Sequence, residues 1–337
     1  MKFSLSILCT LVCLGSVISF AGTEQAPSWA YLGQTPPGAE PRLFAPGVVN
    51  MGLHSRDFTM TPDGRELYFC VILGQYKLSN IVGCRFENGR WSAPQVVPGL
   101  DQPGIHYIEP HISADGKKFF FASNRPAPGK EFNERDEDIW VMERQGSGWG
   151  EPRNLGAPVN TPGGEFFPTT TVDGSLYYTG PDTTGKGEAI YRSRWVDGRY
   201  AAPEKLPPQI NAGKARFNAY VSPDGCLAIV PIVGRPDSLG GCDYYVVFHN
   251  EDGSWSEPVD LGPAINTPGD EYSASLSPDG RYLFFMSARM PAAEQMPARL
   301  TFEYIVGLHR SAPNGNPAIY WVDASFIEKL RPGGSKE

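Results

Sequence analysis

Short apolar segments separated by polar turns run along the chain, a pattern that predicts strands. Five times an apolar segment leads into a turn similar to Pro-Asp-Gly, and a second apolar segment follows. These stretches are TPDGRELYF (61–69), SADGKKFFF (113–121), TVDGSLYYT (171–179), SPDGCLAIV (222–230) and SPDGRYLFF (277–285). Successive turn aspartates are 52, 58, 51 and 55 residues apart, counting through Asp63, Asp115, Asp173, Asp224 and Asp279. Such regular spacing indicates a repeat architecture.

A second motif, an aromatic residue followed three positions later by proline, lies 21 residues before four of these aspartates, counted from the proline. Its members are Trp91/Pro94, Trp149/Pro152, Tyr200/Pro203 and Trp255/Pro258. Short turns precede the aromatic residues, as in ENGR (87–90), and Asn-Gly or Asp-Gly between strands favours a tight hairpin. Each repeat is therefore predicted to hold four antiparallel strands, which we call a, b, c and d in chain order.

A four-stranded sheet that recurs about every fifty residues is typical of a propeller blade. The fold class predicted is therefore all-β, a five-bladed β-propeller of four-stranded antiparallel blades over residues 40–330. The last repeat has a strand c near Ile319 but no strand d. The segment EPRLFAPGVVN (40–50) resembles EPRNLGAPVN (151–160), which belongs to a regular strand d. We expect this N-terminal strand to complete the last blade and close the ring.

The SPDG turn, the following x-x-Leu-Tyr-Phe-x-Ser-x-Arg and the G-x-W-S-x-P segment resemble the TolB-like propeller repeats of secreted and periplasmic bacterial proteins. The resemblance covers roughly residues 40–330 and is specific for the fold rather than for an activity. The chain departs from the pattern at Val172 and Ala114, where proline is usual. It also has five repeated turns, whereas the family often has six blades. Proteins with this repeat often serve as interaction platforms, which implies a binding function.

The first 21 residues combine one lysine, a long apolar run and Ser19-x-Ala21, the pattern of a secretory signal peptide cleaved after Ala21. An uncleaved anchor is the alternative. We expect a linker over 22–39, a C-terminal tail over 331–337, no membrane span after cleavage, and a periplasmic or secreted monomer. Without Lys2 the chain has 28 basic and 37 acidic residues, a net charge of −9. This charge excludes nucleic acid as a partner, since phosphate binding needs a basic surface.

Four cysteines remain after residue 21, and two of them raise the question of a disulfide. Cys70 lies in strand b and Cys84 in strand c of the first blade. A hairpin centred near Gln75 would bring them roughly opposite, so we expect that a disulfide can form in an oxidising compartment. Cys226 and Cys242 lie at opposite ends of another hairpin and should stay apart.

Candidate functional residues follow from counting back from each turn aspartate, because the first residues of each strand a face the mouth of the central channel. Positions eight and six residues before the aspartates differ from blade to blade, as a site on the axis requires. We name four candidate catalytic carboxylates there: Asp57, Glu109, Glu165 and Glu271. Candidate ligand-binding residues around them are His54, Arg56, His106, Tyr107, His111, Arg125, Arg216, Arg235, Asp270, Tyr272 and Arg289.

The prediction for function is an exported binding module whose channel mouth binds a glycan, a small ligand or an envelope protein. The alternative is a glycan-active hydrolase or lyase with two of the four carboxylates as acid and base or nucleophile, and with arginines that favour an acidic sugar. The structural alternative is that Glu109, Glu165 and Glu271 pair with arginines or cap the backbone. Tyr107, Phe166, Phe217 and Tyr272 could stack on sugars or pack between blades.

No cofactor is expected, and the sequence assigns no metal site. The histidines His54, His106 and His111 with Asp57 or Glu109 leave a divalent metal open as an alternative. The acidic run ERDED (134–138) is interpreted as a turn cap and a solvated loop. The longest insertion, residues 290–316, contains the apolar stretch TFEYIVGLHR and is expected to fold over the mouth as a lid.

Overall fold

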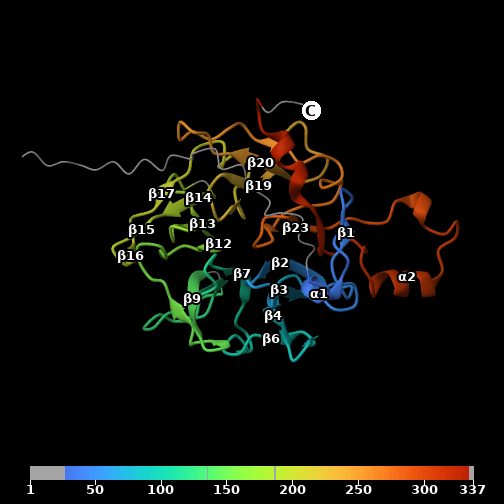
Figure 1. The fold of residues 1–337 in the computed structure, drawn as a ribbon, viewed down its shortest axis with the longest axis horizontal. Helices are drawn as coiled ribbons and strands as arrows, with labels where there is room; N and C mark the ends of the chain where they lie inside the picture. The colour runs from blue at the N-terminus through green and yellow to red at the C-terminus, as the bar shows by residue number, and fades with distance from the viewer. Residues whose placement is uncertain (1–26, 135, 186, 334–337) are drawn as a thin grey trace, which may run out of the picture.

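Five antiparallel sheets stand around a common axis in the computed structural model, which describes residues 27–134, 136–185 and 187–333 (Figure 1). Strand a of each sheet is innermost, and the inner strands of blades 1 and 2, 2 and 3, 3 and 4, and 5 and 1 contact one another around the axis. The fold is the predicted five-bladed β-propeller. The proposed signal peptide (1–21), the start of the linker (22–26) and most of the tail (334–337) lie outside the described residues.

The blades follow one another along the chain. Blade 1 contains β2 (His54–Met60), β3 (Glu66–Leu73), β4 (Leu78–Glu87), β5 (Arg90–Trp91) and β6 (Gln95–Val96). Blade 2 contains β7 (Tyr107–Ile112), β8 (Lys118–Ser123), β9 (Asp138–Gln145), β10 (Gly148–Trp149) and β11 (Arg153–Asn154). Blade 3 contains β12 (Phe166–Thr170), β13 (Leu176–Pro181), β14 (Glu188–Ser193) and β17 (Glu204–Lys205), with a ribbon of β15 (Trp195–Val196) and β16 (Arg199–Tyr200).

Two blades complete the ring. Blade 4 contains β18 (Tyr220–Val221), β19 (Leu227–Val233), β20 (Cys242–Phe248) and β21 (Val259–Asp260). Blade 5 contains β22 (Ala274–Leu276), β23 (Tyr282–Ser287) and β24 (Ala318–Asp323). Its outermost strand is β1 (Arg42–Leu43), in which Arg42 pairs with Trp321 and Leu43 with Tyr320. The first and last described strands therefore share one sheet.

The repeated turns have the same hydrogen bonds in all five blades. The aspartate accepts one bond from a hydroxyl two residues before it and another from the backbone N–H two residues after it. In blade 1, Thr61 Oγ1 donates to Asp63 Oδ1 over 2.6 Å, and the Arg65 N–H donates to the same oxygen over 3.0 Å. A Ser or Thr before the Asp is therefore a structural requirement of the turn.

Four buried asparagines fasten the loop after strand d to strand c of the same sheet. In each case the side-chain oxygen accepts from a backbone N–H of strand c, and the side-chain nitrogen donates to the carbonyl of that same residue. Asn211 does this with Ile190, over 2.7 and 3.2 Å. The other pairs are Asn50 with Ile319, Asn160 with Ile139, and Asn266 with Tyr244. The amide thus substitutes for one more residue of a β-ladder.

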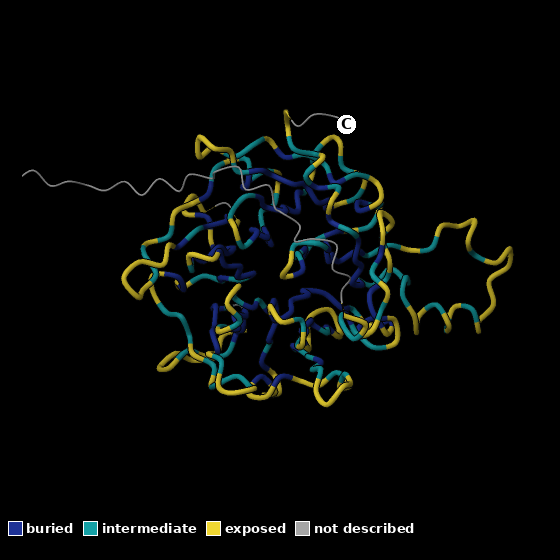
Figure 2. The backbone as a smooth tube through the Cα atoms, viewed as in Figure 1, coloured by how far each residue is buried: buried dark blue, intermediate teal, exposed yellow. Residues whose placement is uncertain are grey.

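The hydrophobic core lies between neighbouring blades, and large aromatic side chains fill it. The rings of Phe58 on β2 and Phe284 on β23 stack with centroids 3.9 Å apart, which joins blade 1 to blade 5. Residues 27–39, expected to be a linker, pack onto these two blades near α1 (Ala30–Gly33). Tyr31 is only 6% exposed and contacts the Trp321 ring, while Trp29 stacks on Phe86. Figure 2 shows the buried segments grouped inside the ring.

The disulfide expected in blade 1 is not formed. Cys70 and Cys84 are free and form no disulfide. The hairpin does turn near Gln75, but this register pairs Cys70 with Ile81 and Cys84 with Leu67. Cys70 and Leu67 are an odd number of residues apart on β3, so the two thiols lie on opposite faces of the sheet, in different core clusters.

The insertion over 290–316 is not a lid. It contains η1 (Ala293–Gln295) and α2 (Phe302–His309), and it extends away from the side of the ring (Figures 1 and 2). The chain then returns through β24 to η2 (Ala324–Phe326) and η3 (Glu328–Leu330). Within the described residues, no helix is both long enough and apolar enough for a membrane span.

Candidate functional site

A residue in the left-handed backbone region occurs at the same place in strand a, or just before it, in every blade. These are the residues six positions before the turn aspartates: Asp57 (φ 59°), Glu109 (58°), Phe167 (53°), Asn218 (53°) and Ser273 (68°). In β2, β7 and β12 the ladder register shifts at this point, as a β-bulge requires. None of the five is glycine, although a positive φ is costly for other residues. The backbone of this ring repeats, whereas its side chains differ.

Arg56 is at the centre of the polar network on the axis. The side chain is buried, and each of its three nitrogens donates a hydrogen bond. Nε bonds Asp57 Oδ1 over 2.7 Å, Nη1 bonds the Tyr76 hydroxyl over 2.9 Å, and Nη2 bonds Glu109 Oε1 over 2.6 Å. The guanidinium also lies over the Tyr272 ring, 4.9 Å from its centroid. These buried carboxylates favour the charged form, so the pKa of Arg56 is raised further above its ordinary value.

Glu109 links three blades. Its Oε1 accepts from Arg56 of blade 1, and its Oε2 accepts from the backbone N–H of Phe167 at the bulge of blade 3, over 2.6 Å. Its own N–H donates to Cys70 Sγ over 3.2 Å. Burial raises the pKa of Glu109 above its ordinary value, and the negative charge of Asp57 adds to this shift while Arg56 opposes it.

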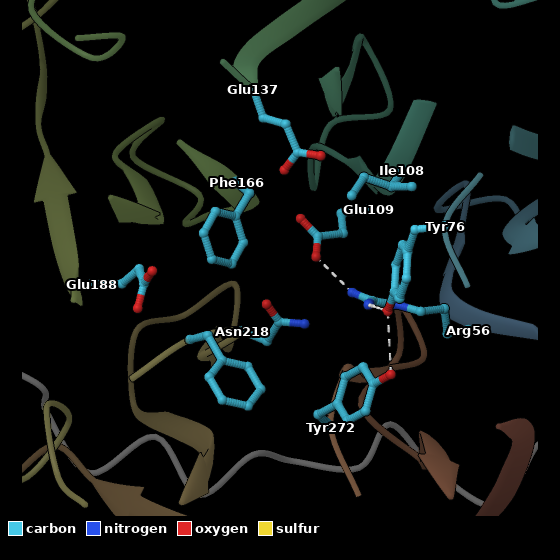
Figure 3. Close-up of a pocket in the computed structure, with 10 residues that line it drawn as sticks. Arg56, Tyr76, Ile108, Glu109, Glu137, Phe166, Glu188, Asn218 and Tyr272 are labelled. Carbon is cyan, nitrogen blue, oxygen red and sulfur yellow. Dashed lines mark hydrogen bonds and ion pairs between the residues drawn. The ribbon is translucent and has the colours of Figure 1, made fainter. Parts of the chain in front are cut away.

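A cavity of about 350 Å³ opens above this network on the face formed by the b-to-c connections and the starts of strands a. Figure 3 shows the side chains of Glu137, Glu109, Asn218 and Tyr272 directed into it from different blades. The full lining consists of Arg56, Tyr76, Ile108, Glu109, Glu137, Phe166, Glu188, Phe217, Asn218 and Tyr272. We call this cavity the axial pocket.

Several polar atoms at the axial pocket have no partner among the residues that the structure describes. Asn218 is 2% exposed, and its Nδ2 donates to Ser273 Oγ over 3.1 Å, but its Oδ1 is buried without a hydrogen bond. The Glu137 and Glu188 side chains form no ion pair with any described residue. Burial raises the pKa of Glu137, an effect that the charge of Arg56 opposes. The pocket therefore offers hydrogen-bond acceptors to a ligand.

Of the four candidate catalytic carboxylates, only Glu109 lines the axial pocket. Asp57 lies just below it, against Arg56. Glu165 and Glu271 instead hold the loops that precede their strands. Glu165 Oε2 accepts from the Thr161 N–H over 2.9 Å, and Glu271 Oε2 accepts from the Thr267 N–H over 3.0 Å. Each carboxylate also accepts from the hydroxyl of the same threonine. Burial raises the pKa of Glu165 to about 7.

The candidate histidines do not come together. His111 joins blades 2 and 3, since its Nε2 accepts from the Thr170 N–H over 3.0 Å, and burial lowers its pKa to about 3. His54 lies edge-on to Tyr76, and burial together with the charge of Arg56 lowers its pKa to about 4. His106 bonds Asn124 through its backbone N–H. Among the described residues, no three His, Cys, Asp or Glu side chains are grouped so as to hold a metal ion.

The remaining candidate residues lie around the ring rather than at the axial pocket, except Arg56 and Tyr272. Arg125 lies over Trp140, and Arg289 lies over Tyr320 and donates to the Ile265 carbonyl. Arg235 forms two bonds with Asp237, and Arg216 lies 3.8 Å from Asp182. Tyr107 is buried in the core of blade 2, and Asp270 is an exposed loop residue.

Five pocket residues were missed by the sequence analysis: Tyr76, Ile108, Glu137, Glu188 and Asn218. Ile108 and Asn218 lie in or just before strand a but were not singled out. The other three come from the b-to-c connections or the first residue of strand c. The lengths of these connections differ between blades, so the repeat register does not align their residues. Glu137 belongs to the acidic run that we interpreted as a solvated loop. Its place directly before strand c, next to the capping Asp138, was the available signal.

No family model and no curated protein matches the sequence. Among solved structures, the chain is similar to a putative TolB from Agrobacterium tumefaciens (18% identity, 70% of this chain and 70% of that one, TM-score 0.44). It is also similar to TolB from Acinetobacter baumannii (17%, 81% and 57%, 0.42) and to the NanB sialidase from Streptococcus pneumoniae (12%, 75% and 36%, 0.40). The chain thus spans little more than half of the Acinetobacter protein. At these identities, a function for this chain has to be argued from its own site.

Proposed function

We propose that this protein is an exported binding module that takes a small organic ligand into the axial pocket. The observation that carries the proposal is the unpartnered Asn218 Oδ1 at the floor of a cavity of about 350 Å³. A buried acceptor without a hydrogen bond is costly, and a bound ligand that donates to it would remove that cost. Pockets of this size commonly hold small ligands.

The walls of the pocket suit a ligand with a flat or apolar face and several hydrogen-bond donors. Phe166, Phe217, Tyr76 and Tyr272 supply aromatic surface, and Asn218 with the acidic residues supplies acceptors. A terminal sugar unit has this combination of an apolar ring face and hydroxyl donors. A glycan is therefore one ligand that fits, whereas an envelope protein would have to insert a side chain.

Binding is favoured over catalysis because the central charged groups already have partners. Both carboxylate oxygens of Glu109 accept hydrogen bonds, and Asp57 is paired with Arg56. These contacts hold blades 1, 2 and 3 together. Glu165 and Glu271 do not line the pocket, and their carboxylates instead bond the loops that precede their strands.

A glycan-active hydrolase or lyase is the second candidate. One observation favours it: three carboxylates, those of Glu109, Glu137 and Glu188, line a single pocket, and burial raises the pKa of two of them. A carboxyl group that keeps its proton near neutral pH can act as a general acid beside an ionised partner.

Native mass spectrometry of the purified protein with neutral and acidic oligosaccharides would test both candidates. Retained complexes without new masses support the binding module, and shortened products support the hydrolase. Phe217→Ala should abolish either result, whereas Phe302→Ala, which removes a 76% exposed ring on α2, should leave it unchanged. Complexes that persist equally in both variants would reject the axial pocket as the site.

A further inference from the structure

We propose that the group recognised in the axial pocket is an organic ammonium ion, carried by a small amine such as an amino sugar. This inference rests on the proposed function, because it names the ligand class of the same pocket. It differs from the sequence-based expectation of an acidic sugar.

The axial pocket is lined mainly by acidic and aromatic side chains. Among the described residues that line it, Arg56 is the one cation, and the same lining contains Glu109, Glu137 and Glu188, with Asp57 directly below. Arg56 neutralises part of this charge through its ion pairs with Asp57 and Glu109. Glu137 and Glu188 are left without a described cationic partner. An anionic ligand would be repelled, while a cation would be attracted.

Arg56 is also unable to serve as an anion receptor. Its Nε, Nη1 and Nη2 each donate to a protein oxygen, at 2.7, 2.9 and 2.6 Å. A carboxylate ligand would have to displace Asp57 or Glu109, which would leave a buried charge unpaired. The candidate arginines near the ends of the strands bind other groups around the ring and do not line the pocket.

The floor of the pocket has an acceptor without a hydrogen-bond donor, the Oδ1 atom of Asn218. The Nδ2 atom of Asn218 donates to Ser273 Oγ over 3.1 Å, and the backbone N–H of Asn218 donates to Thr179 Oγ1 over 3.1 Å. The Oδ1 atom has no hydrogen bond, and Figure 3 shows it directed toward the cavity. An ammonium group has three N–H donors and can bond this oxygen and a carboxylate together.

The aromatic walls of the pocket also favour a cation. The face of a ring attracts cations, and the pocket already holds one such contact, between the Arg56 guanidinium and Tyr272. Tyr76 and Tyr272 lie with their hydroxyls 3.3 Å apart, and Phe166 and Phe217 line the same cavity. Acidic side chains and aromatic rings together select a positive charge with an organic body.

Isothermal titration calorimetry with glucosamine, glucose, glucuronate and putrescine tests this inference. Glucosamine and glucose differ by one amine, so they form a matched pair. We expect glucosamine to bind at least about tenfold more tightly than glucose, putrescine to bind, and both affinities to fall at high salt. Glu137→Gln and Glu188→Gln should each weaken glucosamine by about tenfold, and Glu303→Gln on α2 should have no effect.

The outcomes separate this inference from the proposed function. Equal binding of glucose and glucosamine, lost in Phe217→Ala, would keep the axial pocket as the site and overturn the ammonium inference. Tighter binding of glucuronate would overturn it as well. If none of the four compounds binds to the folded protein, the ammonium inference is rejected, and the oligosaccharide measurement above then decides the proposed function.

Discussion

Arg56 and Glu109, on the inner strands of two neighbouring blades, form a buried ion pair with 2.6 Å between Nη2 and Oε1. The same Glu109 accepts the Phe167 N–H of a third blade, so one carboxylate joins three sheets. A buried pair of this kind costs desolvation when it forms, but removing one partner costs more.

Replacing Arg56 by methionine should destabilise the protein by about 3–5 kcal/mol, because Asp57 and Glu109 then stay buried without a cation. Urea unfolding of Arg56→Met against the parent protein measures this. Arg235→Met is the control, since Arg235 pairs with Asp237 at the surface, and it should cost less than about 1 kcal/mol. Equal losses in the two variants would contradict the central role of Arg56.

Glu165→Ala should lower the melting temperature and leave ligand affinity nearly unchanged. The variant leaves the Thr161 N–H and hydroxyl without their acceptor, which costs about 1–3 kcal/mol. Thermal unfolding and calorimetry on one preparation check both parts. The exposed Glu151→Ala is the control. A loss of binding without a loss of stability would return Glu165 to the candidate catalytic groups.

Protonation of His111 should remove about 2 kcal/mol of stability between pH 6.5 and 4.5, while carboxyl groups whose pKa is raised by burial, such as Glu165, change the stability in the opposite direction. The pKa of His111 is lowered to about 3 in the folded protein, so the unfolded chain binds the extra proton in this window. In His111→Gln the amide oxygen can still accept the Thr170 N–H. Urea unfolding at several pH values should show that the unfolding free energy of the parent falls relative to that of His111→Gln as the pH is lowered. A difference that does not change with pH would show that the ring binds its proton as readily in the folded protein as in the unfolded chain.

Ser273→Gly should be more stable than Ser273→Ala by about 1 kcal/mol, since only glycine adopts a positive φ without strain. Both variants lose the bond from Asn218, so their difference isolates the backbone effect. At Ser287, which lies in β23, the glycine variant should instead be less stable than the alanine variant. Chemical denaturation of the four variants measures both differences.

Ammonium binding should weaken as the pH falls through the raised pKa of Glu137, because the protonated carboxyl no longer attracts a cation. Calorimetric titration of glucosamine at several pH values checks this. In Glu137→Gln the pH dependence should be reduced. Tighter binding at low pH would indicate a ligand that needs the neutral acid.

The fold was predictable because its signals are local. The turn aspartates and the aromatic-x-x-Pro strands each act within one blade, so they recur in sequence. The sequence identified the position six residues before each turn aspartate as one that varies between blades. Its left-handed backbone could not be predicted, because residues as different as Phe167 and Ser273 occupy it. Bulges depend on packing between blades, which no single repeat records.

The site was predicted less well than the fold. Arg56, Glu109 and Tyr272 were named and do meet at the axis, since inner-strand register carries over from blade to blade. Glu165 and Glu271 were indistinguishable from them in sequence. Only the structure shows that their carboxylates turn back to Thr161 and Thr267. The predicted cysteine pair is wrong because the hairpin register offsets the two residues by three positions, and an odd offset places their side chains on opposite faces of the sheet.

The ring of five left-handed residues has a consequence for how this scaffold changes over time. Its main-chain shape is fixed by bulges and neighbouring blades, and its occupants already include an acid, an amide, a hydroxyl and a phenyl ring. Single substitutions there can alter what the axis presents while the blades stay intact. The propeller is therefore a scaffold with five positions at which the side chain can change, and ligand preference can diverge without a new fold.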